Sequence, residues 1–147
     1  MPQYAFFQGI PGDCDRNGQR WFTLDGWMYQ VGRVVTGRRK VVVHELVLFI
    51  HDLTAATHFA EAVARGRPIK LAEIEVTKVQ GGKELRCLLA RMQDVIITSV
   101  TRTIPPGLPI PTLGQRVEIV YDKIWWTYTP VPSQPHPPSQ LLNLRRA

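Results

Sequence analysis

The chain has few cysteines: Cys14 and Cys87 are the only two among its 147 residues. Two cysteines cannot build a disulfide scaffold, and these two lack metal-ligand spacing. Cys14 lies in a polar turn and Cys87 is expected to face the core, so we expect no disulfide between them. Long apolar runs are missing as well. No segment approaches the ~20 apolar residues that a membrane-spanning helix needs, so the sequence predicts no membrane insertion.

The N-terminus does not have the pattern of a secretory signal peptide. Residues 1–7 lack a basic start, and Gln8 and Asp13 interrupt any apolar segment. We therefore expect synthesis in the cytoplasm without a signal peptide, and we leave export by another route open.

Catalytic motifs are also missing. There is no Gly-x-Ser-x-Gly elbow, and Gly81-Gly82-Lys83 lacks the rest of a phosphate-binding loop and stands between two strands. We therefore predict that the chain is not an enzyme, with no catalytic residue and no cofactor.

Three histidines recur at a spacing of seven, each with a carboxylate nearby. They are His44, His51 and His58, beside Glu45, Asp52 and Glu61. Metal ligation is decided by how the elements converge in space, and not by even spacing. These histidines fall in mid-strand, near a strand end and on a helix, so we predict no metal site.

The net charge of +6 is confined to two places. Arg33, Arg38, Arg39 and Lys40 lie on one predicted loop, and Arg145 with Arg146 lies at the C-terminus. Loop 33–40 has no aromatic residue for base stacking, which single-stranded nucleic-acid binders usually supply. We favour a solvated or partner-facing charge cluster, with nucleic-acid binding as the alternative.

A helical pattern stands between two strand patterns in a sequence that otherwise indicates β-structure. Residues 41–50 are β-branched and apolar, as in a buried strand. Between Thr54 and Arg65 an apolar stripe has helical spacing, and Gly66 follows where a left-handed cap belongs. The stripe consists of Ala55, Ala56, Phe59, Ala60 and Val63. One helix cannot bury this stripe alone, so it must lie on the sheet or plug the mouth of a barrel.

Gly81-Gly82 predicts a two-residue hairpin with a defined register. That register places Ile74 opposite Leu89 and Val76 opposite Cys87 on an apolar face. The opposite face carries Glu75, Thr77, Glu84 and Arg86, with a diagonal ion pair between Glu75 and Arg86. A bend within one long strand is expected after Gln93-Asp94.

The C-terminal third has three predicted parts. Residues 105–114 are a proline-dense protruding loop that carries Leu108 and Ile110. Residues 116–129 form a last strand with apolar side chains on both faces, which indicates a covering surface such as another subunit. Leu108, Ile110, Trp125 and Trp126 are therefore candidate interface residues. Residues 131–147 are predicted to be a Pro-rich flexible tail, which leaves residues 1–130 as a single domain.

Segments across residues 4–130 resemble, in order and spacing, the haemolysin-coregulated protein (Hcp) family, the tube protein of type VI secretion systems. They are Phe6-Phe7-Gln8-Gly9-Ile10-Pro11-Gly12; Trp27; Val41 to Phe49; Asp52-Leu53-Thr54-Ala55-Ala56-Thr57; Ala72-Glu73-Ile74-Glu75-Val76-Thr77-Lys78 before Gly81-Gly82-Lys83; Asp94-Val95-Ile96-Ile97-Thr98-Ser99-Val100; and Tyr121-Asp122-Lys123-Ile124 with Tyr128. The chain departs from the family in its arginine-rich segment 33–40, its proline-dense segment 105–114 and its tail.

The resemblance implies a mainly β protein, a single-domain β-barrel of two packed antiparallel sheets with one flanking α-helix at about 54–65. It implies a homo-oligomer whose hexameric rings stack into a hollow tube, which leaves the cell through the type VI apparatus. The partners it implies are a spike protein, a sheath and small effector proteins in the lumen, with no nucleic acid. Loop 33–40 would then reach the next ring, and the polar face with Glu75, Thr77, Glu84 and Arg86 would line the lumen or the outer surface.

Two alternatives to the type VI tube remain open at this stage. One is a phage-like tail tube protein, which shares the architecture. The other is a monomeric β-barrel module that binds nucleic acid through loop 33–40.

Overall fold

The computed structural model describes residues 1–103, 114–130 and 141–145, most of them in strands. Its elements in chain order are β1 (Gln3–Phe7), β2 (Cys14–Arg16), β3 (Gln19–Thr36), β4 (Arg39–Ile50), α1 (Ala56–Arg65), β5 (Ile69–Gln80), β6 (Lys83–Thr103), β7 (Gly114–Val120), β8 (Lys123–Tyr128) and β9 (Leu141–Arg145). The predicted mainly β fold with a helix near residues 54–65 is confirmed.

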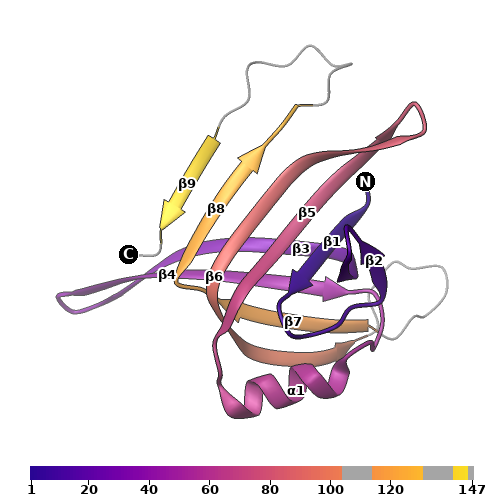
Figure 1. Cartoon of the computed structure of the whole chain (residues 1–147). Coiled ribbons are helices and arrows are strands. Elements are labelled where there is room, and N and C mark those ends of the chain that lie inside the picture. The colour runs from indigo at the N-terminus through magenta and orange to yellow at the C-terminus, as the bar shows by residue number, and fades with distance from the viewer. Residues whose placement is uncertain (104–113, 131–140, 146–147) are drawn as a thin grey trace.

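Six strands close into a barrel in the order β5-β1-β3-β4-β7-β6, and β6 pairs again with β5 (Figure 1). Every pairing is antiparallel. Strand β6 belongs to both halves of the barrel, since residues up to Val95 pair with β5 and residues from Ile96 pair with β7. The predicted bend lies at this change of partner, where Asp94 has φ 52°.

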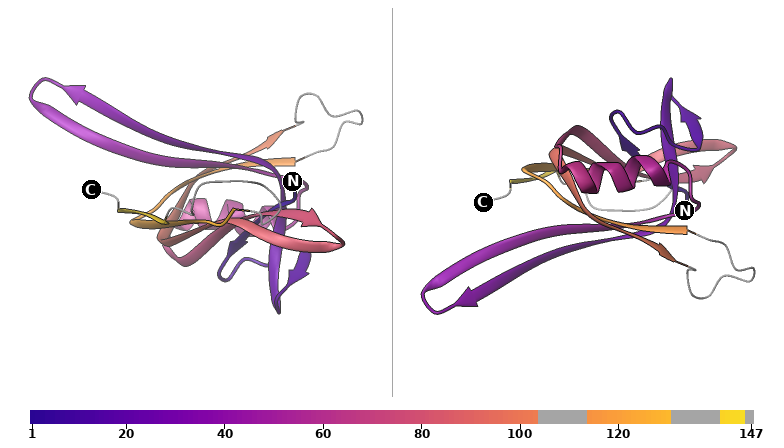
Figure 2. Two further views of the ribbon diagram at one scale, coloured as in Figure 1. Left: turned by 90° about the horizontal axis from the view of Figure 1, so that it is seen from above. Right: turned by 90° about the horizontal axis from the view of Figure 1, so that it is seen from below.

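Helix α1 closes one end of the barrel, which is one of the two placements predicted for it (Figure 2). Phe59 is fully buried, with its ring centroid 5.5 Å from that of Phe7 and 5.1 Å from that of Phe22. The helix ends as predicted at Gly66, whose N–H donates to the carbonyl of Ala62 at 2.9 Å. The apolar stripe of the helix differs from the predicted one at one position, because Ala60 is exposed and Ala62 packs on the core instead.

The prediction of a loop at the basic residues 33–40 is wrong, because β3 and β4 continue through this segment as a hairpin. Thr36 pairs with Arg39, and only residues 37–38 form the turn. The valines on both sides have high strand propensity, and this outweighs the polar character of the cations between them.

The β5–β6 register is confirmed near the turn and wrong beyond it. Thr77 lies opposite Arg86 as predicted, but a bulge follows and Val76 lies opposite Leu88 instead of Cys87. Ile74 consequently lies opposite Ala90 instead of Leu89. The thiol of Cys87 remains buried, as predicted, and donates to the carbonyl of Val76 at 3.2 Å.

The predicted last strand, 116–129, is two strands that pair with different halves of β6. The break at Tyr121-Asp122 interrupts the alternation of inward and outward side chains along this segment. As a result Ile119, Tyr121 and Ile124 are all buried in one core. Part of the predicted tail is also a strand, because Leu141–Arg145 pairs with β8 as β9. The loop prediction at 105–114 falls almost wholly outside the described residues.

Candidate assembly surfaces

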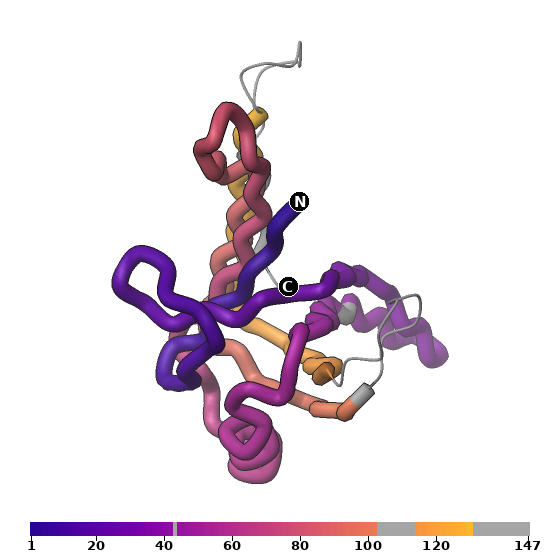
Figure 3. The backbone as a smooth tube through the Cα atoms, turned by 90° about the vertical axis from the view of Figure 1, so that its right-hand side faces the viewer, coloured from indigo at the N-terminus to yellow at the C-terminus, as the bar shows by residue number. Residues whose placement is uncertain are grey.

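The β3–β4 hairpin extends beyond the barrel as an arm (Figures 2 and 3). We define the arm as residues 28–45. Within the arm the two strands pair with each other from Gln30–Glu45 to the turn, whereas β7 pairs with β4 only from Leu46 onward. Within the described part of the chain, both backbone edges of the arm therefore lack a neighbouring strand, and such edges are ready to accept one.

The arm also carries exposed apolar side chains. Met28, Val31, Val34, Val35 and Val41 are each 51–59% exposed. Val34 and Val41 lie directly opposite each other in the register, so their exposed surfaces are neighbours. Contiguous exposed apolar surface on a soluble protein marks an interaction site more often than chance.

The four predicted basic residues are brought together on this arm. Arg33 lies on β3, Arg38 in the turn, and Arg39 and Lys40 on β4, and all four are exposed. No carboxylate pairs with any of them among the described residues. The arm thus combines apolar surface, free strand edges and uncompensated positive charge.

The predicted polar face of the β5–β6 hairpin is also brought together. Arg86 donates to Oε2 of Glu75 at 2.7 Å, and the hydroxyl of Thr77 donates to Oε1 of Glu84 at 2.7 Å. The hydrogen bond from Thr77, followed by the charge of Arg16, holds the pKa of Glu84 below its ordinary value.

Sequence reasoning missed Arg16, which completes this polar cluster. Its guanidinium lies 2.5 Å from Glu75 and 2.9 Å from Glu84, and stacks 3.7 Å above the ring of Tyr4. Burial lowers the pKa of Arg16, but the bonds to Glu75 and Glu84 outweigh it and leave the pKa raised. Arg16 comes from β2, far away in the sequence, so no local pattern pointed to it.

The candidate interface residues fall in different places. Trp126 packs inward, with its ring centroid 5.7 Å from that of Trp27 and 5.1 Å from that of Tyr29. Trp125 lies on the opposite face of β8, half-buried beside Arg91 of the neighbouring strand. Leu108 and Ile110 lie outside the described residues.

The three histidines have separate surroundings. Nδ1 of His44 lies 3.2 Å from the Tyr29 hydroxyl, and Nδ1 of His51 lies 2.8 Å from Oδ1 of Asp25. His58 is exposed on α1. Among the described residues no three His, Cys, Asp or Glu side chains gather as metal ligands, and none of the described helices is both long and apolar enough to span a membrane.

The model of the family described as "Type VI secretion system effector, Hcp" matches residues 4–128. The chain therefore belongs to the Hcp family. No protein of curated function matches the sequence.

Solved structures of Hcp proteins share the fold. A type VI secretion system effector from Yersinia pestis has a TM-score of 0.73 at 18% identity, over 97% of this chain and 98% of that one. Secreted protein Hcp3 from Pseudomonas aeruginosa has a TM-score of 0.67 at 19% identity, over 98% of each chain. Hcp1 from Escherichia coli EAEC 042 has a TM-score of 0.69 at 20% identity, over 87% of this chain and 92% of that one.

Proposed function

We propose that this chain is a structural subunit of a type VI secretion tube. Copies associate edge to edge into hexameric rings, the rings stack into a hollow tube, and the tube is ejected through the type VI apparatus. Its partners are further copies of itself, a spike protein, a sheath and small effectors carried in the lumen. The work is mechanical, and the chain is not an enzyme.

The observation that carries this proposal is the projecting arm in a chain of the Hcp family. A ring needs two different sticky surfaces on each subunit, because its contacts are heterologous. The arm supplies one of them, since Val34 and Val41 would bury their exposed surface against the next copy. The second surface is proposed to include Trp125 on β8, together with Leu108 and Ile110.

The basic residues of the arm are proposed to tune ring stacking. Arg33, Arg38, Arg39 and Lys40 are exposed, so their interactions with a neighbouring ring weaken as salt rises. The polar cluster of Glu75, Thr77, Glu84 and Arg86 suits a wetted surface, either the lumen or the outside of the tube. A nucleic-acid module is disfavoured because residues 33–40 have no aromatic side chain.

Ring formation is tested by light scattering coupled to size exclusion, with negative-stain imaging of the same fractions. The expected species has roughly six times the 16.7 kDa mass of the chain and a central hole. Val34→Ser with Val41→Ser should shift the sample toward monomer. Val79→Ser is the matched control, since Val79 is 60% exposed on the β5–β6 hairpin and outside the arm.

Three results would count against the proposal. The first is a monomer at every concentration, and the second is a monomer that gains mass only when an oligonucleotide is added. The third is stacking that stays the same when Arg38, Arg39 and Lys40 are neutralised. We expect this neutralisation to change the length of stacked assemblies or the salt dependence of stacking. Unchanged stacking would remove the assigned role of these cations. A phage-like tail tube would pass the mass test and would be distinguished by the genes beside its own.

A further inference from the structure

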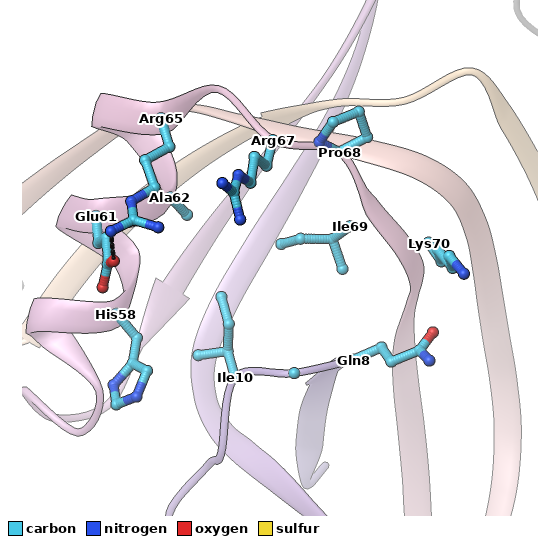
Figure 4. A pocket seen from close by; sticks show the side chains of 11 residues that line it. Gln8, Ile10, His58, Glu61, Ala62, Arg65, Arg67, Pro68, Ile69 and Lys70 are labelled. Carbon is cyan, nitrogen blue, oxygen red and sulfur yellow. Dashed lines mark ion pairs between the residues drawn. The ribbon is translucent and has the colours of Figure 1, made fainter.

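A pocket of about 480 Å³ lies between α1 and the start of β5 (Figure 4). Three segments line it: the turn at residues 8–10, one face of α1, and residues 67–70. The pocket is therefore built by the helix that closes the barrel and by the two chain segments beside it. The arm is not part of its lining, and it projects from a different side of the molecule (Figure 1).

The rim of the pocket is positively charged and incompletely compensated. Among the described residues of the lining, Glu61 is the only carboxylate, and it is already paired with Arg65 at 2.8 Å. Arg67 and Lys70 are exposed, and within the described residues neither of them pairs with a carboxylate. Two cations at this rim are thus available to a ligand.

The floor of the pocket is apolar. Ile10 and Ile69 are 8% and 9% exposed, and their side chains face the same space (Figure 4). Ala62 packs against the core at the helix side. The remaining exposed apolar surface would be covered by an apolar group of a ligand that enters between the cations.

We propose that this pocket binds an acidic peptide segment of a partner protein, with one apolar side chain seated over Ile10 and Ile69 and carboxylates at Arg67 and Lys70. The two charged heads stand apart on the rim (Figure 4). This spacing matches carboxylates distributed along a chain better than a single phosphate. Among the described residues that line the pocket there is no Phe, Tyr or Trp, so base stacking would have only the His58 ring as a platform.

The assay measures fluorescence polarisation of a labelled, capped peptide with four glutamates flanking two leucines. A second peptide replaces both leucines with serine, and a third replaces the glutamates with lysine. The protein variant is Arg67→Ser with Lys70→Ser. Its matched control is Lys83→Ser with Arg102→Ser, which removes the same charge from two exposed sites outside the pocket. Light scattering of each variant reports its mass.

The acidic leucine peptide is expected to bind, and Arg67→Ser with Lys70→Ser should weaken it at least about fivefold. The control variant should change it less than about twofold, and the serine peptide should bind more weakly to the unaltered protein. Equal loss in both variants, or equal binding of the leucine and serine peptides, would reduce the effect to general charge attraction and overturn the proposal. Competition by inorganic phosphate or an oligonucleotide at lower concentration than the peptide would replace it with an anion or nucleic-acid site.

The mass measurement separates this proposal from ring formation. Peptide binding can be measured on a ring or on a monomer, so failure to form rings leaves the pocket testable. If Arg67→Ser with Lys70→Ser lowers the assembled mass, the pocket is a contact between copies of this chain and the proposed partner is wrong.

Discussion

Oε1 of Glu75 accepts a hydrogen bond from the guanidinium of Arg16 at 2.5 Å, which joins β2 to β5 across the outside of the barrel. The other carboxylate oxygen accepts from Arg86 of β6 at 2.7 Å. The Glu75 side chain is only 4% exposed, so its charge depends on these two partners for compensation. One carboxylate therefore links three strands.

Glu75→Gln should lower the free energy of unfolding by about 2–4 kcal/mol, because it keeps the shape but leaves the half-buried Arg16 without its closest charge partner. Urea denaturation measures the change. Glu61→Gln is the control, since Glu61 and Arg65 are 51% and 55% exposed and their pair should contribute about 0.5 kcal/mol or less. Equal effects of the two substitutions would contradict the role given to Glu75.

The contacts of Glu75 also separate what the sequence could predict from what it could not. The Glu75–Arg86 pair is local to a hairpin whose turn and strand alternation are visible in the sequence, so it was predictable. Arg16 is 59 residues away from Glu75, and no local pattern indicates that β2 folds over this face. The bulge at Cys87 could not be predicted from the sequence either. Apolar residues follow one another there, and they are compatible with both the predicted and the observed β5–β6 register.

The arm illustrates a second limit of the sequence. Residues 33–40 combine cations with glycine, a composition that indicates a loop when read alone. Their valines instead continue the ladder of β3 and β4 almost to the tip, up to the Thr36–Arg39 pair. The position of the cluster was predictable from its charge, whereas its form depended on pairing between strands on either side of the turn.

Phe59→Ala should destabilise the fold by about 3–5 kcal/mol. The substitution empties the space between the rings of Phe7 and Phe22, where α1 closes the barrel. Thermal unfolding followed by circular dichroism measures the effect. Ala60→Ser, at the exposed neighbouring position, should stay within about 0.5 kcal/mol. A small effect of Phe59→Ala would mean that the helix does not plug the barrel.

Gly12→Ala should cost about 3 kcal/mol or more, or prevent folding. A Cβ atom at this position would lie 2.0 Å from the carbonyl oxygen of Trp21, which belongs to the backbone and cannot move aside cheaply. Gly32→Ala is the matched control because a Cβ there meets nothing within 4 Å. Chemical denaturation of both variants checks the difference, and a tolerated Gly12→Ala would show that residues 12 and 21 are not packed this closely.

Both thiols should react slowly with a disulfide reagent in the folded protein. Burial raises the pKa of Cys14 and of Cys87, so little reactive thiolate forms near pH 8. Cys87 should react more slowly, because it is buried whereas Cys14 is half-buried. The Cys14→Ser variant leaves Cys87 as the one reacting thiol, so its slow reaction is measured alone. Unfolding in urea should make both thiols of the unaltered protein react fast. A fast phase retained in Cys14→Ser would place Cys87 at the surface.

His51 should make stability depend on pH in one direction. The hydrogen bond to Asp25, supported by the charge of that carboxylate, raises the pKa of His51 above its ordinary value near 6.5. The folded protein then holds this proton more tightly than the unfolded chain. The resulting stabilisation is complete below the unfolded pKa and is lost as pH rises through the folded pKa. The side chain is 47% exposed, so solvent screening limits the effect to about 0.2–1 kcal/mol.

The measurement is the difference in unfolding free energy between the unaltered protein and His51→Gln, followed from pH 5.5 to pH 9. Subtraction removes the contributions of all other groups, which both proteins share. The difference should be largest at the acidic end and shrink above about pH 6.5. Asp25→Asn should greatly weaken this pH dependence, since it removes the carboxylate that contributes most to the raised pKa of His51. A difference that grows with pH has the wrong sign and would exclude a stabilising His51–Asp25 pair.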